Sequence, residues 1–203
     1  MAPETDERPP HGPPGADGSW WALGLSVAVV AVLVTGWPLL DAALPDTEPV
    51  PSGRTLQVGS SQEVEARFTL RQDGWDLHSG TSTAERVYHF SRGPAELTLT
   101  TVTPTTAVPP TAPELWRGLD RTLRARDGSA RLGAPDTTTA QDGTRGLTGT
   151  LTSDTESGTA VLYPSPDGRF AVSMTLAGRD ATRADLAAVD DVLTSITFHQ
   201  EDV

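Results

Sequence analysis

The sequence predicts an α+β domain, an antiparallel β-sheet packed by two amphipathic helices, preceded by one transmembrane helix. Residues 20–40 form an uncharged apolar run, and several stretches beyond residue 62 alternate apolar and polar side chains. Two further segments place apolar residues at helical spacing. Turn signals between successive strands favour antiparallel hairpins, and the two helices must pack on the sheet to bury their apolar stripes.

The apolar run, WWALGLSVAVVAVLVTGWPLL, has the length of a membrane span. About 21 helical residues rise about 30 Å, the thickness of a bilayer's hydrocarbon core, and backbone groups in lipid must satisfy one another within a helix. Trp20, Trp21 and Trp37 stand at its two ends, where indoles favour the membrane interfaces. A cleaved signal peptide is the alternative, although its apolar region typically has only about 7–15 residues.

The orientation is less constrained, because Arg8 precedes the run and Arg54 follows it. A short tail before a large domain fits a signal anchor, so we expect a single-pass protein of the cell membrane with a cytoplasmic N-terminus and an extracytoplasmic domain. The expected parts are a disordered acidic Pro/Gly-rich tail (1–19), the transmembrane helix (20–40), a Pro-rich linker (41–61) and the folded domain (62–199).

The folded domain is expected to begin with strands. Residues 64–70 alternate apolar and polar side chains, which predicts a strand with one buried face. Asp73-Gly74, Arg92-Gly93-Pro94 and Asp167-Gly168 supply turns. Further strands are expected at 75–77, 85–91, 95–103, 146–153, 159–163 and 169–177.

Two helices are expected between and after these strands. The first begins at Thr111, which has capping-box spacing to Glu114, and leucines then recur at i, i+4 and i+8. The second is expected over 182–193, where Thr182 and Asp185 again have the spacing of a capping pair. Its apolar face is formed by Leu186, Val189 and Leu193.

This order of motifs resembles a known family. A Phe68-x-Leu70 strand, Gly74-Trp75, a hairpin, one helix, a β-meander and a closing LTSITF segment after a helix resemble the PsbP-like α/β/α sandwich of exported or membrane-anchored actinobacterial proteins. The resemblance covers roughly residues 62–199. It implies a binding or chaperone-like role and supplies no catalytic residue. The lipoprotein members carry a lipidated Cys, which this Cys-free chain lacks.

Composition and motifs argue against several classes of chemistry. The formal net charge of −12 makes nucleic acid a poor partner, and the absence of Cys excludes disulfides, thiolate metal sites and Cys nucleophiles. The chain has no G-x-S-x-G elbow, P-loop or G-x-G-x-x-G motif. Nothing in the spacing makes Asp76, His78 and His89 converge on a metal. We therefore expect no catalytic residue, no metal site, no cofactor and no enzyme activity.

Two polar surfaces are candidate partner-binding sites. Arg117 and Arg121 make the first helix basic within an acidic domain, where an acidic partner or a phosphate-rich polymer could dock; a solvated helix face is the alternative. Threonines also alternate with leucines on two expected strands, either as an ordinary wet sheet face or as an open face for a partner. These residues are Thr98, Thr100, Thr148 and Thr150.

Together these observations predict a membrane-anchored extracytoplasmic binding or chaperone-like module without catalysis. Its expected partners are the membrane, through one helix, and an envelope protein or polymer of unknown identity. A bitopic regulatory protein that signals through its cytoplasmic N-terminal tail is the alternative. A hydrolase built on an unrecognised site is a third hypothesis.

Overall fold

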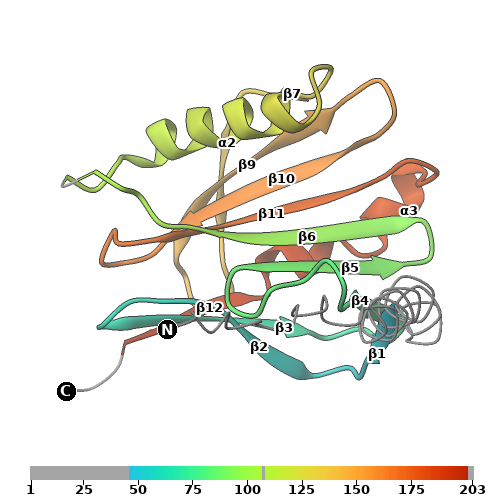
Figure 1. The fold of residues 1–203 in the computed structure, drawn as a ribbon, viewed down its shortest axis with the longest axis horizontal. Helices are drawn as coiled ribbons and strands as arrows, with labels where there is room; N and C mark the ends of the chain where they lie inside the picture. Colours follow the sequence, from blue (N-terminus) through green and yellow to red (C-terminus); the bar gives the residue numbers. More distant parts are fainter. Residues whose placement is uncertain (1–45, 107, 201–203) are drawn as a thin grey trace, which may run out of the picture. The chain divides into compact units, whose positions relative to one another are not determined.

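The computed structural model describes residues 46–106 and 108–200, which form two antiparallel β-sheets with helical segments on both sides (Figure 1). The larger sheet contains β1 (Thr47–Val50), β4 (Trp75–His78), β5 (Val87–Arg92), β6 (Ala95–Val102), β7 (Arg131–Leu132), β8 (Asp136–Thr139), β9 (Arg145–Thr152), β10 (Ser157–Pro164) and β11 (Ala171–Gly178). The smaller sheet contains β2 (Arg54–Ser60), β3 (Val64–Leu70) and β12 (Ile196–Gln200). The helical segments are α2 (Ala112–Arg126), α3 (Arg183–Ala187) and the 3-10 helix η2 (Asp190–Thr194).

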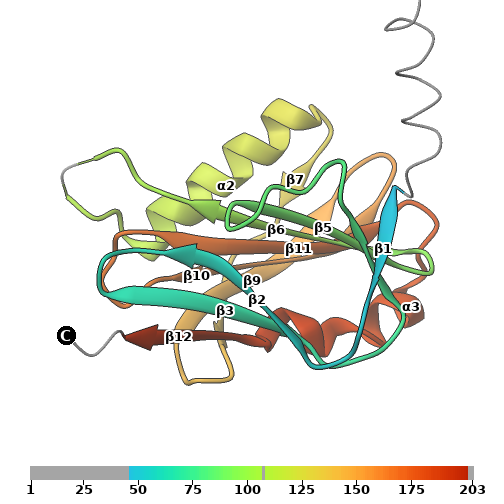
Figure 2. The ribbon, with the colours of Figure 1, turned by 60° about the horizontal axis from the view of Figure 1, so that its bottom comes forward.

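The strands of the larger sheet lie in the order β1-β4-β5-β6-β11-β10-β9-β7, with β8 also paired to β9. The smaller sheet has the order β12-β3-β2. Figure 2 shows three layers: α2 lies on one face of the larger sheet, and the smaller sheet and α3 lie on the other. We call the face that carries α2 the outer face of the larger sheet.

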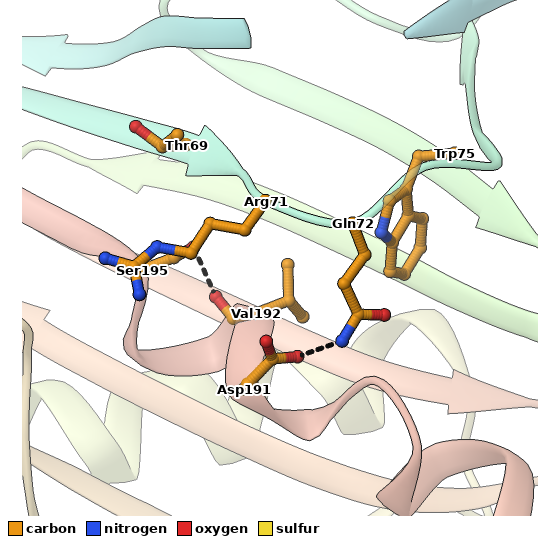
Figure 3. Close-up of a pocket in the computed structure, with 7 residues that line it drawn as sticks. All are labelled: Thr69, Arg71, Gln72, Trp75, Asp191, Val192 and Ser195. Carbon is orange, nitrogen blue, oxygen red and sulfur yellow. Dashed lines mark hydrogen bonds between the residues drawn. The ribbon is translucent and has the colours of Figure 1, made fainter. Parts of the chain in front are cut away.

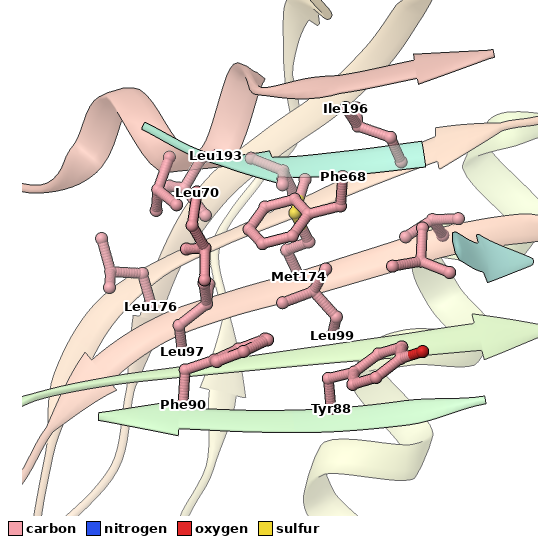
Figure 4. Packing of buried hydrophobic residues seen from close by; sticks show 14 of the residues in the cluster. Phe68, Leu70, Tyr88, Phe90, Leu97, Leu99, Met174, Leu176, Leu193 and Ile196 are labelled. Atoms are coloured by element: carbon pink, nitrogen blue, oxygen red, sulfur yellow. The ribbon is translucent and has the colours of Figure 1, made fainter. Parts of the chain in front are cut away.

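The main hydrophobic core fills the space between the two sheets. The alternation predicted for residues 64–70 is confirmed, because Val64, Ala66, Phe68 and Leu70 are buried while the residues between them are partly or fully exposed. Strand β3 therefore turns one apolar face toward the larger sheet. Figure 4 shows the centre of this core, which contains Phe68, Leu70, Tyr88, Phe90, Leu97, Leu99, Met174, Leu176, Leu193 and Ile196.

The predicted fold class, a sheet packed by two amphipathic helices as in an α/β/α sandwich, is wrong. The described chain is mostly antiparallel β-structure. The face of the larger sheet opposite α2 is covered chiefly by the smaller sheet rather than by a helix. The helix expected over 182–193 is only the five residues of α3, none of them buried, followed by η2. The backbone leaves the α-helical region at Val189, and the tighter 3-10 turn then buries Val192 and Leu193.

The boundary expected between linker and domain at residue 62 is also corrected. Strands β1 and β2 lie within the stretch expected to be a Pro-rich linker, and the compact unit begins at Asp46. Val50 and Val58 are buried in the main core. Pro49 lies on β1, an edge strand paired only with β4, which is where a sheet tolerates proline.

The predicted single-pass membrane localisation is contradicted. Across residues 46–106 and 108–200, no helix has both the length and the apolar character needed to cross a bilayer. The segment 20–40, with Trp20, Trp21 and Trp37, lies outside the described residues, as does the tail 1–19. The expected extracytoplasmic position of the domain depends on that anchor and is corrected with it.

A polar contact joins the two sheets at one end of the core. The Asp167 carboxylate, in the β10–β11 turn, accepts hydrogen bonds from Ser61 Oγ at 2.6 Å and from the Arg169 backbone N–H at 3.1 Å. Ser165 Oγ also donates to it. Burial raises the pKa of Asp167, but these hydrogen bonds outweigh burial and the net pKa is lowered. Ser61 lies in the β2–β3 turn, so the carboxylate connects the smaller sheet to the larger one.

This link predicts a pH-dependent contribution to stability. We expect Asp167→Ala to lower the free energy of unfolding by about 1–3 kcal/mol at pH 7. Because the folded pKa lies below the unfolded value of about 3.9, the contribution is complete above that value and is lost as the pH falls through the folded pKa. Urea melts at pH 7 and pH 3 measure it, with the exposed Asp180→Ala as control. An equal loss at both pH values would exclude the ionised carboxylate as its source.

Candidate functional site

Helix α2 covers only part of the outer face of the larger sheet. It is anchored by Trp116, which is 5% exposed and packs with Ala160 and Leu162 of β10. The indole Nε1 of Trp116 donates to the Gly133 carbonyl at 3.3 Å. Strand β9 makes room for this ring with Gly149, because a Cβ there would lie 2.8 Å from the indole. The helix therefore sits over β9, β10 and β7, beside the outer face of β6 and β11.

A groove of about 1320 Å³ runs between α2 and the uncovered strands. Its floor is formed by hydroxyl-bearing residues of β6 and β11: Thr98, Thr100, Ser173 and Thr175. Its wall is formed by half-buried leucines of α2, namely Leu115, Leu119 and Leu123, with Leu162 of β10 beneath them. The groove is therefore apolar along the helix and polar along the sheet.

The strand register fixes which threonines face the groove. Thr98 pairs with Thr175, Thr175 pairs with Ala160, and Ala160 pairs with Gly149, so these four residues share the outer face. Thr148 and Thr150 flank Gly149 on β9 and therefore point to the opposite face. Of the four threonines proposed from the sequence, the structure brings Thr98 and Thr100 to the groove and places Thr148 and Thr150 away from it.

The arginines proposed from the sequence also line the groove. Arg117 and Arg121 are exposed on α2, and their Nε atoms donate to backbone carbonyls of the same helix at 3.4 Å and 3.3 Å. Among the described residues, neither forms an ion pair. Arg124, in contrast, pairs with Asp120. The groove therefore has cationic side chains available along its helical rim, to which Arg126 adds a third.

Two histidines lie on the outer face of the larger sheet, and one of them, His89, contacts the floor of the groove at Thr98. His89 Nδ1 and Thr98 Oγ1 are 3.1 Å apart, and His78 Nε2 and Ser91 Oγ are 2.9 Å apart. Burial lowers the pKa of His89, and the positive charge of Arg126 acts in the same direction, which favours the neutral imidazole at pH 7. Within the described part of the chain, no three His, Asp or Glu side chains converge as metal ligands.

The loop between β6 and α2 borders the groove, and the sequence did not identify it as part of a site. Pro104, Pro109 and Pro110 line the groove there, and Val108 is 75% exposed. Val108 is the only large apolar side chain in the described residues that is this exposed. An apolar residue in a Pro-rich loop beside an amphipathic helix is the sequence signal that could have indicated this border.

A second cavity has no room for a ligand. It has a volume of about 10 Å³ and lies between the end of β3, the start of β4 and η2 (Figure 3). Gln72 Nε2 donates to Asp191 Oδ1 at 2.9 Å beside it, and the Trp75 side chain is buried. This volume is at the lower limit for a single water molecule. The large groove is therefore the candidate functional site.

Helix α2 contains one residue whose replacement is expected to stabilise the chain. A Cβ at Gly118 would meet no atom within 4 Å, so alanine adds no clash there. We expect Gly118→Ala to raise the free energy of unfolding by about 0.5–1 kcal/mol, because glycine is a poor residue for a helix interior. Gly149→Ala is the matched contrast, since its Cβ would press on Trp116 and lower stability by about 1–3 kcal/mol. Denaturant melts compare the two, and a destabilising Gly118→Ala would contradict the open space beside α2.

Comparison with known proteins leaves the family open. No family model matches the chain, and no curated protein matches it. A mutant of the protein Mog1 is 15% identical with a TM-score of 0.40, and the match covers 78% of this chain and 92% of that one. The Saccharomyces cerevisiae Ran-binding protein Mog1p is 16% identical with a TM-score of 0.40, covering 77% and 91%. A Bacteroides thetaiotaomicron protein is 10% identical with a TM-score of 0.32, covering 74% and 50%.

The similarity to PsbP-like domains, inferred from sequence motifs, stays a prediction.

Proposed function

We propose that this chain is a non-catalytic binding module that holds an elongated ligand in the groove beside α2, with apolar groups of the ligand against the helix. The observation that carries the proposal is the row of half-exposed leucines, Leu115, Leu119 and Leu123, above an open strand floor. Apolar surface in a groove stays in contact with water until a ligand covers it. Covering it is favourable, because removing apolar surface from water lowers the free energy.

The chemistry of the lining supports binding over catalysis. The acidic side chains at the groove, Glu114 and Asp120, are already engaged: Glu114 accepts from the Thr111 N–H at 2.8 Å, and Asp120 pairs with Arg124. The other polar groups are hydroxyls and arginines. None of these lining hydroxyls lies beside a histidine except Thr98, whose neighbour His89 is itself partly buried.

The proposal is tested with 1-anilinonaphthalene-8-sulfonate, an anionic aromatic probe whose fluorescence rises in apolar surroundings. We expect the full chain to bind this dye at the groove. Thr175→Phe fills the floor, and Gly118→Phe fills the groove from the helix, where the structure has open space. Both variants should reduce the dye fluorescence several-fold.

The matched control is Thr150→Phe, the same substitution on the opposite face of the sheet. It should leave the dye signal close to that of the unmodified chain. Any dye signal from apolar segments outside the groove is common to both chains and therefore cancels in the comparison. Thermal melts confirm that each variant is folded. If both groove-filling variants are folded and bind the dye as the control does, the groove is not the binding site.

A further inference from the structure

We propose that the natural ligand of the groove is an acidic peptide segment of a partner protein, bound in extended form with aliphatic residues against α2. This inference rests on the proposed function and names its ligand class.

The groove is larger than a typical small-molecule site. Its volume of about 1320 Å³ exceeds the range of about 300–1,000 Å³ common for small ligands. It is bounded along its length by α2 and by the loop that carries Pro109 and Pro110. A chain of several residues fills such a space better than one compact metabolite.

The floor favours a peptide over an acyl chain. Among the described residues, the hydroxyls of Thr100 and Thr175 make no side-chain hydrogen bond, whereas Ser173 Oγ donates to the Thr100 carbonyl at 3.2 Å. Thr100 and Thr175 lie on neighbouring strands of the floor. Backbone N–H and C=O groups of an extended peptide can pair with these hydroxyls, but an acyl chain would cover them without a partner, which costs free energy.

The wall has the spacing of repeated apolar contacts. Leu115, Leu119 and Leu123 follow one another at one-turn intervals along the helix, about 6 Å apart. Alternate side chains of an extended peptide recur at about 6.5–7 Å on one face. Aliphatic residues at every second ligand position can therefore meet successive leucines.

The charges on the rim select an acidic ligand. Arg117, Arg121 and Arg126 line the groove, and none of the ion pairs within the described residues includes them. The chain as a whole carries a formal charge of −12, so this rim is a local exception. Carboxylates of a ligand would complement it and would also steer its approach.

The ligand class is tested by selection from phage-displayed random dodecapeptides on the immobilised full chain, after depletion on the Thr175→Phe variant. We expect the enriched sequences to combine Asp or Glu with Leu, Ile or Val. The most enriched peptide is then synthesised with a fluorescent label, and its affinity is measured by anisotropy. Arg117→Gln/Arg121→Gln should weaken its binding roughly 3- to 30-fold, and added NaCl should weaken binding to the unmodified chain.

The matched control is Arg145→Gln/Arg179→Gln, which removes two exposed arginines outside the groove. This control should change the affinity by less than twofold.

Enriched peptides that are neutral or basic would overturn the acidic class while leaving the groove as a binding site. Absence of enrichment, with the dye still bound at the groove, would overturn the peptide class. In that case, displacement of the dye by a fatty acid would identify a lipid ligand instead. If no peptide is enriched and the groove-filling variants also bind the dye as well as the unmodified chain does, the proposed function is overturned too.

Discussion

Replacing Phe68 with alanine is expected to lower the free energy of unfolding by about 3–5 kcal/mol. Phe68 is fully buried on β3, at the centre of the core between the two sheets. Its ring centroid lies 6.1 Å from that of Phe90 on the larger sheet. Truncation removes this contact between the sheets and leaves a cavity in a closely packed interior.

Denaturant melts of the full chain measure this change. Thr55→Ala, on the neighbouring strand of the same sheet but exposed, serves as the control and should change stability by at most about 0.5 kcal/mol. A loss below about 1 kcal/mol for Phe68→Ala would mean that the smaller sheet does not close the core.

The second large effect is expected at Trp116. Trp116→Ala should lower the free energy of unfolding by about 3–5 kcal/mol, because this side chain is the buried anchor of α2. It also removes the hydrogen bond to the Gly133 carbonyl. Since α2 forms one wall of the groove, we expect the same variant to lose binding of the anionic dye.

Arg121→Ala is the control on the same helix, and it should remain within about 0.5 kcal/mol of the unmodified chain, because its side chain is exposed. Dye titration and denaturant melts are run on the same preparations. A Trp116→Ala variant with unchanged stability would show that α2 is not held on the sheet by this residue.

The sequence predicts the elements whose formation is set by residues close together along the chain. The alternation of residues 64–70 indicated β3, and the capping box of Thr111 and Glu114 indicated the start of α2. In the structure, the Thr111 N–H donates to the Glu114 carboxylate at 2.8 Å, as that spacing requires. Such contacts are short-range, and so they can be inferred from residue types and spacing.

The pairing of strands in the smaller sheet could not be predicted in this way. Its strands come from opposite ends of the described chain: β2 and β3 lie near the start, and β12 closes it. Strand β2 also carries a bulge between Gln57 and Gly59, which interrupts its alternation. Without a clear period of two, this segment and its proline-containing flanks have the sequence pattern of a linker.

The candidate site was predicted in part, because the sequence does not fix the register between strands. Thr98 and Thr150 have the same relation to their leucine neighbours, yet pairing through Thr175, Ala160 and Gly149 sets them on opposite faces. The sequence predicts a buried leucine stripe on α2, but in the structure the buried side chain of this helix is Trp116. The leucines are left half-exposed, and this is what forms the groove.

Ligands are expected to bind between α2 and strands β6 and β11. The most direct test uses two-dimensional ¹H–¹⁵N spectra of the isotopically labelled full chain during titration with the anionic dye. We expect the largest shifts at backbone amides that border the groove, such as those of Thr98, Leu119 and Thr175. Largest shifts at Thr150 or at Ser195, on the opposite side of the larger sheet, would contradict the assignment of the groove as the binding site.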